Sequence, residues 1–140
     1  MSVLLGLDLG EKRVGVAVSD ESGMLAMPFA TLAFSGRKDL LSQLVKIVDE
    51  HGVTKIIVGL PKTLKGEIGP SAEKVMKEVE WLKGQLDRPW IFWDERLSTA
   101  EVERILIEAD VRRDKRKQVR DQLAAQRILQ SYLDYERSQT

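Results

Sequence analysis

The chain contains no cysteine, a single histidine and no long apolar run. The absence of cysteine excludes disulfides and thiolate metal sites, and it fits the reducing conditions of the cytoplasm. No stretch approaches the roughly 18 apolar residues that a membrane-spanning helix requires, so we expect no membrane partner. The N-terminus has no basic segment and carries an early charge, unlike a signal peptide. These features are compatible with a cytosolic protein.

The chain also lacks an excess of charge of one sign. Lys plus Arg and Asp plus Glu both number 22, so net charge does not identify a nucleic-acid partner. The apolar content of 43% is ordinary for a globular protein, and 140 residues fit one compact domain over residues 1–140. The sequence does not fix the oligomeric state, for which we expect a monomer or a weak homodimer.

The stretch from Gly6 to Asp20 has the pattern of a β-hairpin, because apolar residues alternate before and after its turn. Asp8 falls on the face of the first strand that carries the smaller residues. If the corresponding faces of the two strands coincide, Asp8 is surrounded by Gly6, Gly15 and Ala17, which leaves room for a cation or a phosphate. The alternative is an aspartate that only hydrogen-bonds the backbone of its own turn.

The rest of the chain alternates between strand and helix patterns. We expect strands over 27–33, 55–59 and 90–93, and helices over 37–51, from 70, from 98 and from about 119. An antiparallel start followed by alternating helices and strands predicts an α/β fold with a mixed sheet flanked by helices.

Basic residues gather in two segments that are candidates for phosphate contacts. The connection over 60–70 is long for a simple turn, and long loops at strand ends often carry function. Six of the nine residues over 112–120 are basic, which predicts either a phosphate-contacting segment or a solvated connection. The expected phosphate-binding residues are Arg13, Lys62, Lys65, Arg96, Arg112, Arg113, Lys115, Arg116 and Lys117.

Three carboxylates are candidates for a shared metal site. They are Asp8, Glu95 just after the strand over 90–93, and Asp121 on the apolar line of the last helix. Ionised acids cannot gather without a cation, and hard oxygen ligands favour Mg²⁺ or Mn²⁺. Asp94 is the rival of Glu95, since strand alternation places the two on opposite faces. Asp121 has a simpler explanation as a favourable charge in the first turn of a helix.

Four blocks in this order resemble the YqgF (RuvX) family of pre-16S rRNA nucleases. The blocks are Gly6–Gly10 with Arg13–Asp20, Val58–Pro61 with Gly66, Asp94–Thr99, and Asp121–Ala125 with Ile128–Asp134. The resemblance implies a ribonuclease-H-like fold with a five-stranded mixed sheet of order 3-2-1-4-5, in a cytoplasmic bacterial protein. It also places the acids of the family on Asp8, Glu95 and Asp121.

The implied function is a metal-dependent endonuclease that hydrolyses phosphodiester bonds at the 5′ end of pre-16S ribosomal RNA, with ribosomal particles as further partners. Two alternatives remain: a Holliday junction resolvase acting on branched DNA, and a non-catalytic RNA-binding factor in ribosome assembly or transcription. Junction resolvases carry a second aspartate one turn after the first in the last helix. Ala124 and Ala125 occupy that turn here, which counts against junction resolution and against a second metal ion.

Overall fold

A computed structural model describes residues 2–61, 65–94 and 113–139 of the chain. The predicted helix that begins at residue 98 lies outside these ranges. The described elements are β1 (Val3–Leu9), β2 (Arg13–Ser19), β3 (Ala26–Ala33), α1 (Arg37–His51), β4 (Val53–Leu60), α2 (Pro70–Gln85), β5 (Trp90–Asp94) and α4 (Arg113–Ser138).

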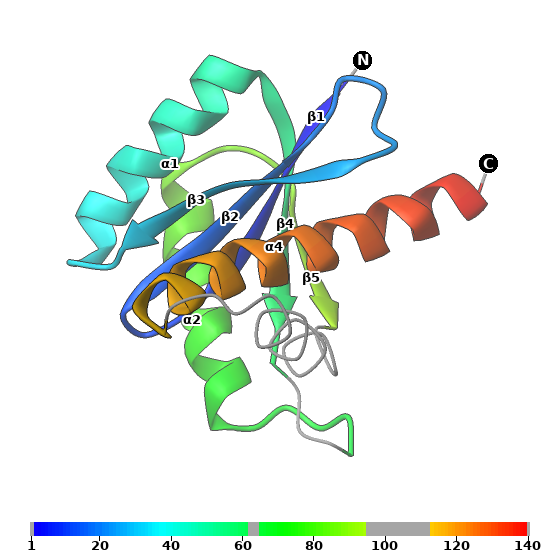
Figure 1. The fold of residues 1–140 in the computed structure, drawn as a ribbon. Coiled ribbons are helices and arrows are strands. Elements are labelled where there is room, and N and C mark those ends of the chain that lie inside the picture. Colours follow the sequence, from blue (N-terminus) through cyan, green and yellow to red (C-terminus); the bar gives the residue numbers. More distant parts are fainter. Residues whose placement is uncertain (1, 62–64, 95–112, 140) are drawn as a thin grey trace.

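The strands form one mixed sheet in the order β3-β2-β1-β4-β5, which confirms the predicted sheet and strand order. The pairs β1–β2 and β2–β3 are antiparallel, whereas β1–β4 and β4–β5 are parallel. Because β1, β4 and β5 run in the same direction, their carboxyl ends meet at one edge of the sheet, at the bottom of Figure 1. In open α/β sheets, such an edge is where ligands bind.

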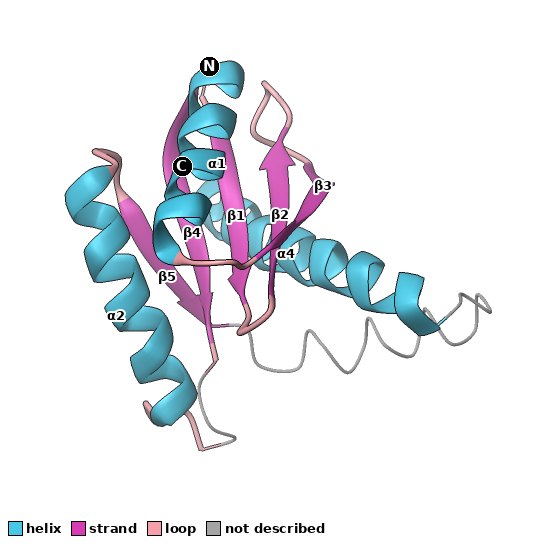
Figure 2. Cartoon of the chain, turned by 90° about the vertical axis from the view of Figure 1, so that its left-hand side faces the viewer, coloured by secondary structure: helices cyan, strands magenta, loops and turns pink. Residues whose placement is uncertain are grey.

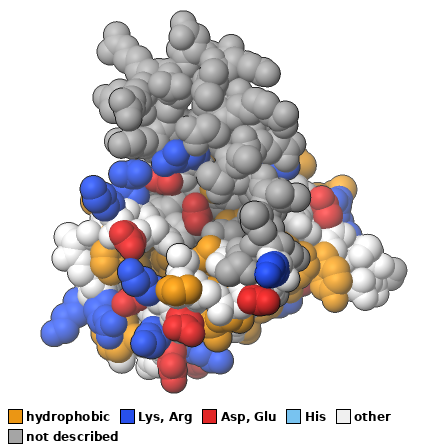
Figure 3. Space-filling model, turned by 90° about the horizontal axis from the view of Figure 1, so that it is seen from below, with side chains coloured by type: hydrophobic (Ala, Val, Ile, Leu, Met, Phe, Trp, Pro, Cys, Tyr) orange, Lys and Arg blue, Asp and Glu red, His pale blue; other side chains and the backbone are white. Residues whose placement is uncertain are grey.

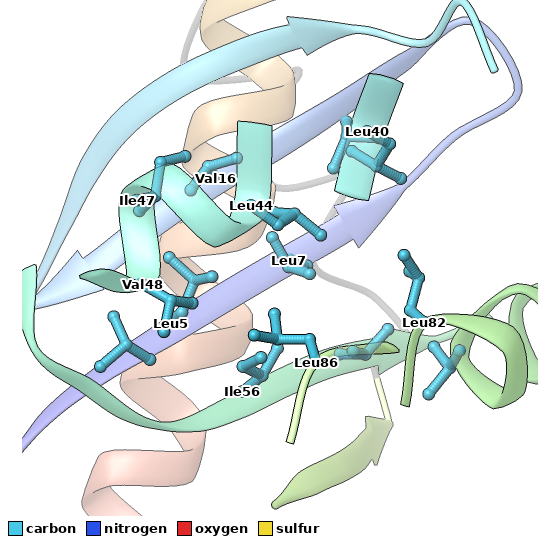
Figure 4. Close-up of a cluster of buried hydrophobic side chains, with 14 of the residues drawn as sticks. Leu5, Leu7, Val16, Leu40, Leu44, Ile47, Val48, Ile56, Leu82 and Leu86 are labelled. Atoms are coloured by element: carbon cyan, nitrogen blue, oxygen red, sulfur yellow. The ribbon is translucent and has the colours of Figure 1, made fainter. Parts of the chain in front are cut away.

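Helices cover both faces of the sheet (Figure 2). On one face α1 and α2 pack together against β4, and on the other α4 crosses β1, β2 and β3. Successive side chains of β1 point alternately to these two faces. Leu5 and Leu7 are fully buried beneath α1 and α2 with Leu40, Leu44 and the other side chains of Figure 4. Full burial of each such leucine contributes about 2 kcal/mol to folding.

The opposite face of β1 is shaped for close approach of α4. A buried stripe on α4 packs there, made of Ala125, Ile128, Leu129, Tyr132 and Leu133. A Cβ atom on Gly6 would lie only 2.7 Å from the Leu129 Cβ, so the helix rests on bare strand backbone. The predicted apolar line of the last helix is therefore confirmed, and Asp121 lies at the start of it.

The start of α4 differs from the prediction. The helix begins at Arg113 and not near Val119, so residues 113–120 of the basic segment are part of the helix backbone. Arg, Lys and Gln are good helix formers, whereas the prediction relied on the apolar stripe, which begins only later. Although α4 has 26 residues, neither it nor any other helix in the described ranges has the length and apolar character needed to cross a membrane.

Candidate active site

Asp8 lies near the carboxyl end of β1, on the face that α4 covers. It is half-buried and pairs with Gly15 of β2, while Gly6 pairs with Ala17. The predicted surroundings of Asp8 on β2 are therefore confirmed. On the other side, the parallel ladder pairs the residues just before Asp8 and Gly59, so β4 also presents a glycine beside this carboxylate. Backbone without side chains thus flanks Asp8 on both neighbouring strands.

Asp121 is held beside Asp8 by the packing of α4 on Gly15. A Cβ atom on Gly15 would lie 1.9 Å from the Asp121 carbonyl oxygen, so the helix backbone rests directly on this glycine. The Cα atoms of directly opposed residues in an antiparallel pair are about 5 Å apart. Since Gly15 is opposite Asp8, the Asp121 backbone above Gly15 lies about one inter-strand spacing from the Asp8 backbone. The fold therefore brings two of the three predicted acids to one face of the sheet.

Arg13 pairs with Asp121. The Arg13 Nε donates a hydrogen bond to the Asp121 Oδ2 at 2.8 Å, and the two side chains are 30% and 16% exposed. Charge-assisted bonds of this kind fix the direction of a carboxylate as well as stabilising it. The prediction assigned Arg13 to phosphate contacts and missed this pair. Strand alternation could have revealed it, because Arg13 and Gly15 lie on the same face of β2.

Asp94 lies on the other side of the sheet from Asp8. It pairs with Leu60 of β4, and Leu60 is buried in the cluster beneath α1 and α2. Residues paired across a ladder share a face, so Asp94 faces away from α4. Glu95, its predicted competitor for the site, lies outside the described residues.

The predicted phosphate-binding residues are only partly described. Lys65 is exposed in the connection that follows β4. The backbone of α4 carries Arg113, Lys115, Arg116 and Lys117 in its first turns. Lys62, Arg96 and Arg112 lie outside the described residues. Seen from below, Lys and Arg side chains lie among acidic and hydrophobic ones on this face of the molecule (Figure 3).

The donor atoms of the site suit a hard cation. Asp8 and Asp121 offer carboxylate oxygens, which are the ligands that Mg²⁺ and Mn²⁺ prefer. Within the described ranges, no group of three or more His, Cys, Asp or Glu residues could hold a metal ion. The third expected acid, Glu95, is not among the residues described, so the three-acid site stays a prediction.

Comparison with known proteins places the chain in a family. The sequence model of RuvX, described as Holliday junction resolvase, matches residues 2–135. The chain belongs to the RuvX family. Relatives named "Putative pre-16S rRNA nuclease" cover nearly all of this RuvX chain and of themselves. The relative from Desulforudis audaxviator is 45% identical over 96% of both chains, and that from Geobacillus sp. (strain WCH70) is 50% identical over 94% of this chain and 96% of its own.

Solved structures of resolvases share the fold of this RuvX member. RuvC from T. thermophilus, in complex with a Holliday junction substrate, has a TM-score of 0.61 at 12% identity and covers 99% of this chain and 96% of its own. The Fowlpox virus resolvase has a TM-score of 0.56 at 13% identity and covers 95% and 97%. The predicted ribonuclease-H-like fold is thus confirmed. Together with the family, the names of the relatives support classification as a nuclease, an enzyme that hydrolyses phosphodiester bonds.

Proposed function

We propose that this RuvX-family chain is a divalent-metal-dependent endonuclease that acts on the 5′ region of pre-16S ribosomal RNA. The observation that carries the proposal is the meeting of Asp8 and Asp121 across Gly15, at the edge where β1, β4 and β5 end. The relatives named for pre-16S rRNA supply the substrate.

The proposed metal ligands are Asp8, Asp121 and Glu95. A bound Mg²⁺ or Mn²⁺ would lower the pKa of a coordinated water and stabilise charge that develops on the phosphate. Arg13 holds one carboxylate oxygen of Asp121 and thereby fixes the direction in which this ligand faces. The backbone of α4 fills the space over Gly15, so a phosphate of the RNA backbone would approach Asp8 from the side of Gly59, which carries no side chain.

The basic residues contact RNA phosphates and do not recognise the bases. Lys65 follows β4 in the chain, and the first turns of α4 lie toward the edge of the sheet where β1 ends (Figure 1). Lysine and arginine contacts to phosphates fix the register of a nucleic acid, and their strength falls as salt is added. We assign Lys62, Arg96, Arg112, Arg113, Lys115, Arg116 and Lys117 to the same role.

The buried turn of α4 after Asp121 favours RNA cleavage over junction resolution. Ala124 and Ala125 are almost completely buried, and the Ala125 carbonyl lies 3.0 Å from where a Gly6 Cβ would be. An additional carboxylate therefore has no space at position 125. The site we propose has fewer acids than the resolvase pattern, which argues against branched DNA as the main substrate.

The test is to incubate the full chain with a precursor 16S rRNA fragment and, separately, with a four-way DNA junction. Each reaction is run with Mn²⁺, with Mg²⁺ and with EDTA. We expect the RNA to be cut only with metal, and Asp8→Asn to abolish cutting. Asp94→Asn is the matched control, because this acid faces the opposite side of the sheet, and it should retain activity.

Three results would contradict the proposal in different ways. Cleavage of the junction alone would make branched DNA the substrate. RNA binding that weakens with salt but never leads to cutting would favour the non-catalytic alternative. Full activity of Asp8→Asn, with contaminating nuclease excluded by a mock purification, would place the active site elsewhere.

A further inference from the structure

A concave surface lies at the end of the sheet remote from Asp8. It is a pocket of about 600 Å³ between the last turn of α1, the end of β2 and the start of β3. Figure 1 shows these segments near the N-terminus, opposite the edge where β1 ends. Val3 lines the pocket and lies five residues before Asp8 in β1, a separation of about 17 Å along the strand.

Negative charge surrounds the pocket. Asp20, Glu21 and Glu50 line it, and none of its described lining residues is Lys or Arg. The Ser22 hydroxyl, together with the Leu25 and Met24 backbone N–H groups, holds the pKa of Asp20 below its ordinary value. The carboxyl end of α1 adds the partial negative charge of its terminal carbonyl groups. The potential here favours cations and repels phosphates.

Apolar side chains are exposed in and beside the same pocket. The exposed large hydrophobic residues of the described chain include four within the short stretch 24–29: Met24 at 50%, Leu25 at 60%, Met27 at 45% and Phe29 at 41%. Met27 and Phe29 line the pocket itself. Clustered exposure of this kind marks protein interaction sites more often than single exposed residues do.

The backbone of β3 positions Phe29 for this role. The register of β3 shifts between Ala30 and Pro28, so Phe29 is an additional residue that the partner strand does not match. Such a bulge redirects a side chain. The Phe29 ring meets the His51 ring edge to face, with centroids 5.0 Å apart, and this contact joins the wall of the pocket to the end of α1.

We propose that this pocket binds a protein partner through a segment in which basic and apolar side chains alternate. The acids and the helix end would contact the basic groups, and Met27 and Phe29 the apolar ones. The exposed Met24 and Leu25 enlarge the apolar surface beside the pocket, and a small cation would leave that surface uncovered. RNA is disfavoured here by the same charges, so the two ends of the molecule bind partners of opposite charge. The inference does not depend on nuclease activity.

The experiment uses a fluorescein-labelled peptide in which arginine and leucine alternate, and it measures binding to the full chain by anisotropy. Glu50→Lys and Phe29→Ser change exposed residues of the pocket, and each should weaken binding roughly tenfold. Asp49→Lys is the matched control, because it makes the same charge change on an exposed residue outside the pocket, and it should bind like the wild type. Amide shifts in NMR should be confined to the pocket residues.

Matched peptides separate specific recognition from general attraction. Replacing the leucines by serine should weaken binding roughly tenfold, and replacing the arginines by glutamate should abolish it. Equal losses in Glu50→Lys and Asp49→Lys, or undiminished binding of the serine peptide, would overturn the proposal. Displacement of the peptide by an equal concentration of spermidine would also overturn it, because the pocket would then bind any cation. A dimer of the chain that Phe29→Ser dissociates would overturn it too, because the surface would then be an interface between two copies. Asp8→Asn should bind the peptide normally, which keeps this test separate from that of the nuclease.

Discussion

Gly15 and Asp121 touch through their backbones, since a single added carbon on Gly15 would lie 1.9 Å from the Asp121 carbonyl oxygen. Through this contact the last helix meets the β2 strand of the hairpin that carries Asp8. It lies between two residues far apart in the chain, and it sets how closely the two acids can approach each other.

Gly15→Ala should displace α4 and destabilise the protein by several kcal/mol, because backbone atoms cannot move aside as a flexible side chain can. Thermal unfolding measures the effect, and RNA cleavage should fall with it. Gly84→Ala is the control: Gly84 lies in α2, a Cβ atom there meets nothing within 4 Å, and alanine should stabilise the helix by about 0.5–1 kcal/mol. Equal effects of the two changes would refute the proposed contact.

The pair of Arg13 and Asp121 should show measurable coupling. A double-mutant cycle with Arg13→Gln and Asp121→Asn, followed by urea unfolding in EDTA, should give a coupling energy of about 1 kcal/mol, because both side chains are partly buried. The ion pair of Lys74 and Glu11 is the control, with side chains 71% and 82% exposed. Exposed pairs contribute little, so that cycle should give a smaller value. A coupling near zero for the first pair would contradict its role.

Ala125→Asp should not convert the chain into a junction resolvase. Ala125 is fully buried against the sheet, so an aspartate there would place a carboxylate in a closely packed interface. We expect a loss of several kcal/mol in the free energy of unfolding and no cutting of a four-way junction. Ala125→Asn has the same size without the charge and should be less harmful. A stable Ala125→Asp variant that cuts junctions would show that this position can accept a ligand.

The attachment of β4 to the carboxyl end of α4 should depend on pH. The Lys55 Nζ and the Tyr132 hydroxyl both donate to the Glu136 Oε2, each at 2.9 Å. The Lys55 hydrogen bond lowers the pKa of Glu136, and Glu136 in turn raises the pKa of Lys55. Burial raises the pKa of Tyr132.

The signs of these shifts define a window of stabilisation. The Glu136 contribution is present above its ordinary pKa of 4.5 and is lost as the pH falls further. The Lys55 contribution is present below 10.5 and is lost as the pH rises through its raised pKa, and that of Tyr132 is likewise lost above 10.0. Glu136→Gln should therefore cost about 0.5 kcal/mol near neutral pH, with the difference from the wild type vanishing in acid. A difference that does not change with pH would disprove the charge effect.

The sequence patterns by themselves determined the strands and the bounds of α1, whereas the order of the strands came from the resemblance to the RuvX family. Alternating leucines in β1, the helical spacing of α1 and the glycine after it are local signals, so their physical cause lies within a few residues. The sequence also singled out Asp8, because a carboxylate among glycines is unusual in a strand. Helix propensity placed the start of α4 less well, since the basic residues before its apolar stripe gave no periodic signal.

Only the tertiary structure decided which acids meet and which basic residue accompanies them. Asp121 lies beside Asp8 because α4 rests on Gly15. Arg13 binds Asp121 because its side chain lies on the same face of β2 as Gly15, the face that α4 covers. Asp94 is excluded from that face by its pairing with Leu60. These relationships depend on the packing of segments distant in the chain, and local patterns do not encode the distance between them. The acidic pocket beside Phe29 arises in the same way, from a bulge and a helix end that only the fold brings together.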